Sequence, residues 1–146
     1  MPNDSVPNAG PILLDTCAWL WLANGHERIA NSRYRQEIEN AGHEGRLFLA
    51  PISMWEVAMK VSKGKLALSS PTAEWIQNSK KRSRIQDAPL SVEVAVDSVE
   101  LPGSFHQDPA DRLIVATARH IGATLVTGDH AIVAYGKTGS LKVWAL

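Results

Sequence analysis

Residues 108–129 read DPADRLIVATARHIGATLVTGD and contain the clearest succession of structural elements in the chain. Asp108 and Pro109 suit the N-cap and first turn of a helix, and Gly122 suits the position just after its C-terminal end. The apolar run over 124–127 follows directly and is typical of a buried strand. A helix that leads straight into a buried strand favours a parallel α/β arrangement.

The remainder of the chain repeats this alternation of apolar runs and helical patterns. Further strand candidates lie at 11–15, 46–50, 84–90 and 141–146. The patterns predict helices over 16–23, 27–41, 51–63, 72–81 and 91–101, with a short one between Asp129 and Tyr135. We therefore expect the α/β class, with a mostly parallel sheet of four to five strands and helices on both faces.

Length and composition favour a single domain. The chain has 146 residues, of which 45% are hydrophobic, enough to form one core. Residues 1–10 are polar and interrupted by Pro2, Pro7 and Gly10, which predicts a flexible lead-in to one domain over 11–146. The formal net charge of +0 does not by itself indicate a nucleic-acid binder.

The sequence shows no signal for export from the cytoplasm. The first residues lack the basic and apolar regions of a signal peptide, and no apolar run is long enough to span a bilayer. The single cysteine, Cys17, lies in an apolar run and is expected to be a buried thiol. We expect a cytoplasmic protein.

Five carboxylates map to one edge of the predicted sheet, and we refer to them as the acidic edge. Asp15 ends the first strand, Glu56 lies early in the helix after the second, Asp108 and Asp111 open the long helix, and Asp129 follows the strand over 124–127. Two carboxylates held close together repel by roughly 4 kcal/mol at an effective dielectric near 20. A hard cation such as Mg²⁺ or Mn²⁺ relieves this repulsion, so the pattern indicates a metal site.

Each of these carboxylates also has a structural explanation. Asp15 could cap the following helix, Asp108 is fully accounted for as an N-cap, and Asp129 could be a turn residue. Glu56 could form an ion pair with Lys60 four residues later. Asp111 would lie in the first turn of a helix, where a carboxylate suits the helix dipole.

Three segments resemble the PIN-domain ribonucleases, and most closely the VapC-like toxins of bacterial toxin–antitoxin pairs. They are ILLDTCAWLWL (12–22), PISMWEVAMKVSKGKLAL (51–68) and FHQDPADRLIVATARHIGATLVTGDHAIVAYG (105–136). The resemblance implies a three-layer α/β/α sandwich and an enzyme that cuts RNA, commonly tRNA, with Mg²⁺ or Mn²⁺. It also implies a homodimer that is inhibited by a cognate antitoxin protein.

The resemblance assigns roles to residues of this chain. The catalytic quartet would be Asp15, Glu56, Asp111 and Asp129, with the metal held by Asp15, Asp111 and Asp129. Thr16 and Thr127 match the small hydroxyl residues beside the quartet, and Asp108 matches an additional carboxylate of one subgroup. Arg112 could pair with a carboxylate or contact a phosphate, whereas a loop histidine such as His106 is ordinarily incidental.

A basic stretch is the candidate for holding the RNA backbone, although it could equally be a solvated helix face. Its members are Lys60, Lys63, Lys80, Lys81, Arg82 and Arg84. Trp19 and Trp55 lie in apolar helical contexts and are expected in the core. Trp19, Trp21 and Leu22 could instead line a groove for an antitoxin helix.

Two other functions are compatible with parts of the pattern. Phosphotransfer through an aspartyl phosphate at Asp15 would require a second aspartate two residues later, where Cys17 stands, so it is disfavoured. A non-catalytic PIN-like binding module, acting through antitoxin binding or dimerisation, would retain the acidic edge without using it.

Overall fold

The apolar runs form a five-stranded, all-parallel sheet in the order β3-β2-β1-β4-β5. The structure, a computed structural model, describes residues 10–146. The strands are β1 (Ile12–Leu14), β2 (Leu47–Leu49), β3 (Gln86–Asp87), β4 (Thr124–Thr127) and β5 (Lys142–Ala145). Central β1 pairs with both β2 and β4, and Ile12 lies opposite Leu47 on one side and Thr124 on the other.

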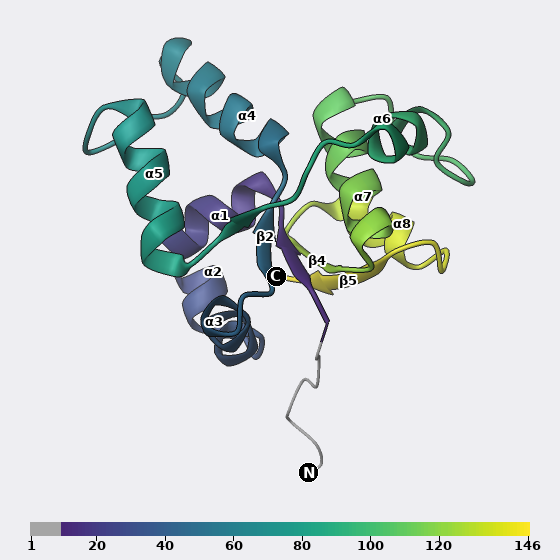
Figure 1. Ribbon diagram of the computed structural model, residues 1–146, viewed down its shortest axis with the longest axis horizontal. Coiled ribbons are helices and arrows are strands. Elements are labelled where there is room, and N and C mark those ends of the chain that lie inside the picture. The colour runs from purple at the N-terminus through teal and green to yellow at the C-terminus, as the bar shows by residue number, and fades with distance from the viewer. Residues whose placement is uncertain (1–9) are drawn as a thin grey trace.

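Helices cover both faces of this sheet and complete the expected three layers. Figure 1 shows α1–α5 on one side of the strands and α6–α8 on the other. The helices are α1 (Thr16–Ala23), α2 (Glu27–Ala30), α3 (Arg35–His43), α4 (Pro51–Ser62), α5 (Thr72–Ser83), α6 (Val92–Val99), α7 (Pro109–Ile121) and α8 (His130–Gly136). The predicted α/β fold class is confirmed.

The sheet separates two hydrophobic cores because successive strand residues point to opposite faces. Ile12 and Leu14 of β1 belong to the core beneath α1, α3, α4 and α5. Leu13, between them, belongs to the core beneath α6, α7 and α8. All three side chains are fully buried, as expected for the central strand of a parallel sheet covered on both faces.

The structure differs from the sequence prediction mainly in the segment 27–41. The single helix expected there is two helices, α2 and α3, separated by a turn. In this turn the Ser32 hydroxyl donates to the Ile29 carbonyl and accepts from the Tyr34 amide, so a side chain takes over bonds that a continuous helix would make. The expected strand over 84–90 shortens to the two residues of β3.

The structure tests the expected N-terminal lead-in and the expected absence of a membrane span only within residues 10–146. The lead-in predicted over residues 1–10 lies, apart from Gly10, outside the described residues. Within the described part of the chain, no helix has the length and apolar character needed to cross a membrane.

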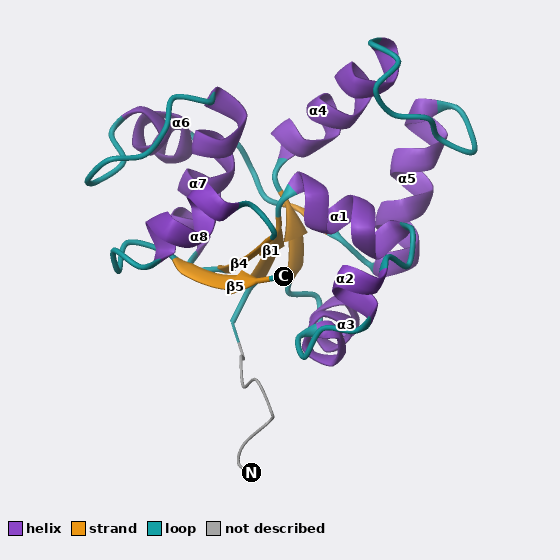
Figure 2. Cartoon of the chain, turned by 180° about the vertical axis from the view of Figure 1, so that it is seen from behind, coloured by secondary structure: helices purple, strands orange, loops and turns teal. Residues whose placement is uncertain are grey.

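The strand order places the ends of β1 and β4 at the point where the chain changes direction across the sheet. From β1 the chain proceeds to β2 and β3 on one side, whereas β4 is followed by β5 on the other. Such switch points open a crevice beyond the carboxyl ends of the strands, where α/β proteins bind ligands. Figure 2 shows α1 and α4 beginning next to one another above these strand ends.

Candidate active site

Asp15 lies immediately after β1 and is only 5% exposed. One carboxylate oxygen, Oδ1, accepts a hydrogen bond of 2.8 Å from the Ala18 amide and thereby caps α1. The other, Oδ2, accepts a short hydrogen bond from the Thr127 hydroxyl at the end of β4. The helix cap and the neighbouring strand therefore fix this carboxylate in one orientation.

Thr127 links Asp15 to Asp129. Its fully buried hydroxyl donates to Asp15 and accepts from the Asp129 amide at 2.9 Å. Asp129 in turn caps α8, because its Oδ1 accepts from the amides of Ala131 and Ile132. The two carboxylates are thus tied through a single threonine, which explains why a hydroxyl residue is needed at this position.

Gly128, between Thr127 and Asp129, is required by close packing rather than by an unusual backbone angle. A Cβ atom here would lie 2.6 Å from Cη2 of Trp21. The Arg28 guanidinium lies 4.5 Å from the ring centroid of Trp21 and donates to the Leu146 carbonyl at 2.7 Å. The indole therefore braces the loop that presents Asp129.

Glu56 reaches the same edge from α4. Its Oε1 accepts a hydrogen bond of 2.5 Å from the Thr16 hydroxyl, and Ser53 Oγ lies 2.8 Å from the same hydroxyl oxygen. Because a carboxylate only accepts, Thr16 donates to Glu56 and Ser53 donates to Thr16. The expected alternative, an ion pair between Glu56 and Lys60, does not occur among the ion pairs of the described residues.

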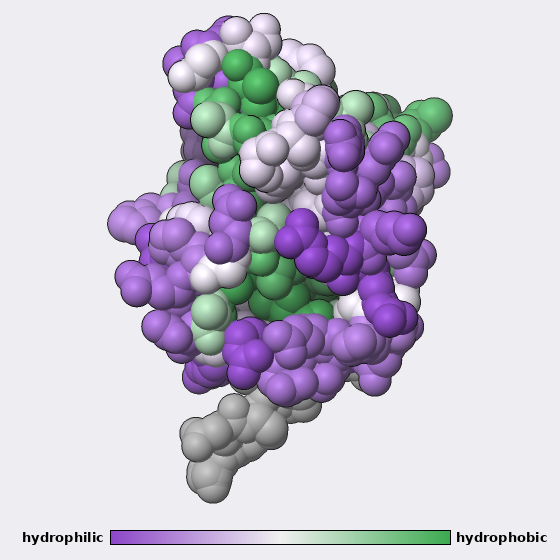
Figure 3. All heavy atoms as spheres, turned by 90° about the vertical axis from the view of Figure 1, so that its left-hand side faces the viewer, coloured by the Kyte–Doolittle hydropathy of each residue, from purple (hydrophilic) through white to green (hydrophobic). Residues whose placement is uncertain are grey.

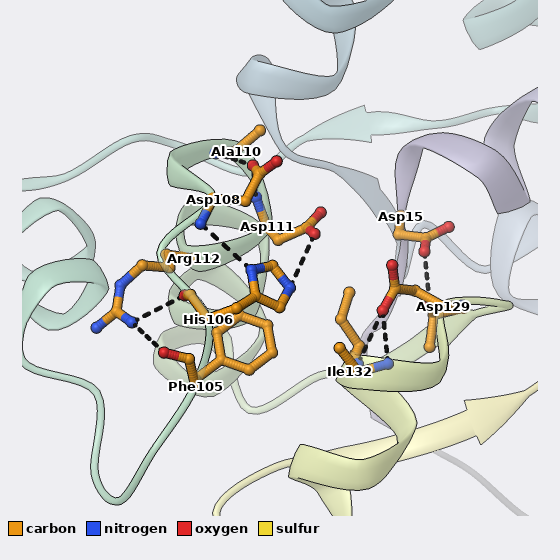
Figure 4. Close-up of polar contacts among 11 residues, drawn as sticks. Asp15, Phe105, His106, Asp108, Ala110, Asp111, Arg112, Asp129 and Ile132 are labelled. Carbon is orange, nitrogen blue, oxygen red and sulfur yellow. Dashed lines mark hydrogen bonds and ion pairs between the residues drawn. The ribbon is translucent and has the colours of Figure 1, made fainter.

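Asp108 and Asp111 approach from the opposite side, at the start of α7. Asp108 is the expected helix cap, since its Oδ1 accepts from the amides of Ala110 and Asp111. Asp111 points toward Asp15 and Asp129 across the space between the elements (Figure 4). Its Oδ2 lies 3.2 Å from Nε2 of His106.

Burial and mutual repulsion raise the pKa values of two of these carboxyl groups. Burial raises the pKa of Asp15 from its ordinary 3.8 to about 6; its hydrogen bonds oppose the increase, and the charges of Asp129 and Glu56 add to it. Burial likewise raises the pKa of Asp111 to about 6, followed in importance by the charges of Asp108 and Asp129. The five carboxylates of the acidic edge therefore form one electrostatically coupled group.

Arg112 does not take the role suggested by its position beside Asp111. Its guanidinium donates to four backbone carbonyls, those of Ser98, Val99, Phe105 and His106. Adjacent residues on a helix point about 100° apart, so a side chain next to Asp111 faces elsewhere. Among the described ion pairs Arg112 has no carboxylate partner, and its guanidinium instead fixes the loop before α7.

The predicted basic stretch is divided by the fold. Figure 1 shows α5 returning toward the sheet from the outer end of α4, which separates Lys60 and Lys63 from the basic residues at the end of α5. Lys60 is close enough to Cys17 for its charge to lower the pKa of the thiol, against the larger raising effects of desolvation and Asp15. Lys80 forms an ion pair with Asp87.

The expected burial of Cys17 and Trp55 is wrong, and that of Trp19 is confirmed. Cys17 is exposed, because it lies in the first turn of α1 at the open edge of the sheet. Trp55 is 55% exposed, whereas Trp19 is fully buried and its indole NH donates to Ser79. Sequence reasoning also overlooked Ser53, whose signal is a polar residue one helical turn before Glu56.

The donor chemistry fits a hard divalent cation. The acidic edge offers carboxylate oxygens, which Mg²⁺ and Mn²⁺ prefer, and Asp15, Glu56 and Asp129 have no ion pair with a lysine or arginine among the described residues. Within residues 10–146, no three acidic, histidine or cysteine side chains already enclose a single point. Mg²⁺ retains several waters and needs only one or two direct carboxylates.

Comparisons with known proteins agree with the sequence resemblance. A family model described as the PIN domain matches residues 12–137. The chain is similar to ribonuclease VapC22 of Mycobacterium tuberculosis, with 32% identity over 133 residues, covering 91% of this chain and 98% of the relative. It also resembles a chain in the crystal structure of VapBC2 from Rickettsia felis bound to a promoter DNA fragment, with a TM-score of 0.64, 20% identity, and coverage of 92% and 97%.

Replacement of Asp15 by Asn tests the electrostatic cost of the site. Because folding raises the pKa of this carboxyl, the folded protein binds more protons than the unfolded chain between about pH 4 and 6. This contribution to the free energy of unfolding therefore falls as the pH rises through that window. Asn can still cap α1, so without metal Asp15→Asn should be more stable at pH 7 by up to about 3 kcal/mol.

The measurement is urea unfolding in the presence of a chelator between pH 4 and 7.5. The stability difference between Asp15→Asn and the parent should grow from pH 4 to 6 and then level off. Glu27→Gln, at an exposed position on α2, is the matched control and should show no such growth. A variant that is less stable than the parent at pH 7 would contradict this account.

Proposed function

We propose, from the premise that this chain belongs to the PIN-domain family of VapC-like ribonuclease toxins, that it hydrolyses phosphodiester bonds of structured RNA such as tRNA with Mg²⁺ or Mn²⁺. The observation that carries the proposal is that the side chains of Asp15, Asp111 and Asp129, from three separate segments, face one another (Figure 4). The raised pKa values of Asp15 and Asp111 support it, because they reflect burial first and neighbouring negative charges second, and a bound cation would offset both.

The residues divide the chemistry between them. Asp15, Asp111 and Asp129 would hold the metal ion, directly or through water. Bound there, the ion supplies positive charge that stabilises the negative charge developing on the phosphate oxygens. Glu56, held by its hydrogen bond from Thr16, orients and deprotonates the attacking water. The water oxygen forms a new bond to phosphorus as the P–O bond to the 3′ oxygen breaks, and the 3′ oxygen takes a proton from solvent, which leaves a 5′-phosphate and a 3′-hydroxyl.

Substrate binding would draw on the basic residues unequally. Lys60, whose charge acts on Cys17 two residues after Asp15, would contact a phosphate close to the scissile bond. Lys63 extends the same end of α4, whereas Lys80 is engaged by Asp87. We propose that this nuclease domain spans residues 11–146 and acts in the cytoplasm, where its RNA substrates are.

A hydrophobic hollow on the face that carries α3 and α5 is the proposed site for a segment of the antitoxin (Figure 3). It has a volume of about 210 Å³ and is lined by Leu22, Ile38, Glu39, Gly42, His43, Leu47, Arg82, Ser83 and Arg84. Its lining combines apolar side chains with two arginines, and its one carboxylate, Glu39, is paired with Arg35, which suits an apolar anchor flanked by carboxylates. The relative from Rickettsia felis was crystallised as a VapBC2 assembly, in keeping with a protein partner.

A second apolar surface is the proposed contact between two copies of the chain. All the large hydrophobic side chains that are exposed in the described residues belong to α4, α6 or the residue before Ser91; they are Trp55, Leu90, Val92, Val96 and Val99. The hollow beside Trp55 and the one beside Leu90 and Val99 share Pro109, so the surface is continuous across the start of α7. Such gathering of exposed apolar side chains marks an interaction site.

Cleavage of total tRNA in the presence of Mn²⁺ tests the nuclease proposal. Asp15→Asn and Asp129→Asn retain the helix caps and remove the charge, so each should fold and lose roughly 100-fold or more of the cleavage rate. EDTA should abolish cleavage by the parent, and Glu27→Gln should cleave normally. EDTA-resistant cleavage, or full activity of Asp15→Asn, would refute the metal mechanism. A folded parent that never cleaves would favour the non-catalytic binding module.

Charge reversal at the hollow tests the antitoxin site. The protein would be co-expressed with the product of the neighbouring reading frame, and the affinity of the purified pair measured by calorimetry. Arg82→Glu should weaken binding by about tenfold, because it places a like charge beside the carboxylates of the partner. Lys137→Glu makes the same charge change at an exposed position after α8 and should leave the affinity unchanged. Equal effects of both variants would exclude the hollow.

Sedimentation velocity tests the self-association surface. The parent should sediment as a dimer, and the double variant Val96→Glu, Val99→Glu should sediment as a folded monomer, because charges would be forced into an apolar contact. Lys142→Glu, at an exposed position on β5, should remain dimeric. A dimer that survives the double variant would show that this surface is not the contact.

A further inference from the structure

His106 lies in the loop before α7 and contacts the acidic edge from its side. Its Nε2 is 3.2 Å from Asp111 Oδ2, and its Nδ1 accepts a hydrogen bond of 3.2 Å from the Asp108 amide. Figure 4 shows the imidazole joined to the Asp108 backbone and to the Asp111 carboxylate, which extends toward Asp15 and Asp129. The histidine that sequence reasoning treated as incidental therefore touches two members of the site.

These two contacts fix the tautomer of the imidazole. Because a backbone amide only donates, Nδ1 must accept from Asp108 and carries no proton there. The ring proton then resides on Nε2, which donates to Oδ2 of Asp111. The hydrogen bond occupies one oxygen of Asp111 and leaves Oδ1 for a ligand.

The surroundings hold His106 in place from two directions. The Phe105 ring lies 4.2 Å from the imidazole, centroid to centroid, and packs in turn against Tyr135. Arg112 donates to the carbonyls of Phe105 and His106, at 3.0 and 3.1 Å. The loop is thus attached to α7 itself, so the helix that carries Asp111 also holds the backbone of His106.

We propose that His106 is a positioning residue for Asp111: its Nε2–H holds the carboxylate in the orientation that binds the divalent cation. The proposal rests on the metal site of the proposed function. Asp111 lies among Asp108 and Asp129, whose like charges favour turning its carboxylate out toward solvent. The donor from His106 opposes this rotation, as partners of ligating carboxylates commonly do.

Two substitutions separate the two nitrogen atoms of the ring. His106→Gln places an amide nitrogen at the position of Nε2 and can still donate to Asp111. His106→Asn places an oxygen at the position of Nδ1, so it keeps the turn with the Asp108 amide and loses the donor to Asp111. A role confined to the loop would be preserved by Asn, whereas a role in positioning would be preserved by Gln.

The readout is the affinity of the full chain for Mn²⁺, measured by calorimetry without RNA, together with the thermal unfolding midpoint without metal. His106→Asn should weaken Mn²⁺ binding by about tenfold or more, and His106→Gln should stay within about threefold of the parent. In an Asp111→Asn background, His106→Asn should cause no further loss, because the two residues act through one interaction.

The outcomes distinguish this inference from the proposed function. If the parent binds Mn²⁺ and His106→Asn binds it equally well, the positioning role is wrong and the metal site stands. If Gln and Asn weaken binding alike, the ring acts through packing and the positioning role is also wrong. If the folded parent binds no Mn²⁺, the proposed metal site itself is wrong, and this inference falls with it.

Discussion

The structure depends on how it holds negative charge at the carboxyl ends of β1 and β4. Asp15 is buried there with other carboxylates nearby, and burial of an ionised group is unfavourable unless it is hydrogen-bonded. The Thr127 hydroxyl and the Ala18 amide supply those bonds. They attach the carboxylate to a neighbouring strand and to a helix terminus, so Asp15 is oriented before any cation binds.

The sequence determines the frame of this arrangement because local rules agree with one another. Asp108, Pro109 and Gly122 mark the ends of α7 where the structure has them, and the strand over 124–127 follows as predicted. Once the strands are parallel, the residues after β1 and β4 must meet at one edge. The prediction that Asp15 and Asp129 lie at one edge of the sheet followed from topology, whereas their assignment to one site also drew on the family resemblance.

What the sequence could not provide is the direction of individual side chains. Arg112 stands next to Asp111 in the chain, yet its guanidinium faces the loop carbonyls because a helix turns by about 100° per residue. His106, five residues before Asp111, meets it through a loop whose course no local pattern predicts. Trp55 shows the same limit: an apolar helical context does not tell which face a partner will cover.

The sequence suggested that each aspartate either caps a helix or binds a metal ion. The two roles do not exclude one another. A carboxylate offers about four acceptor positions on two oxygens, and a cap uses those of one oxygen. Asp108 and Asp129 both cap through Oδ1 alone, which leaves Oδ2 available in each. Capping therefore restrains the side-chain angles and reduces the entropy that a cation would otherwise have to remove on binding. Helix starts at this edge serve the site by supplying carboxylates that are already oriented.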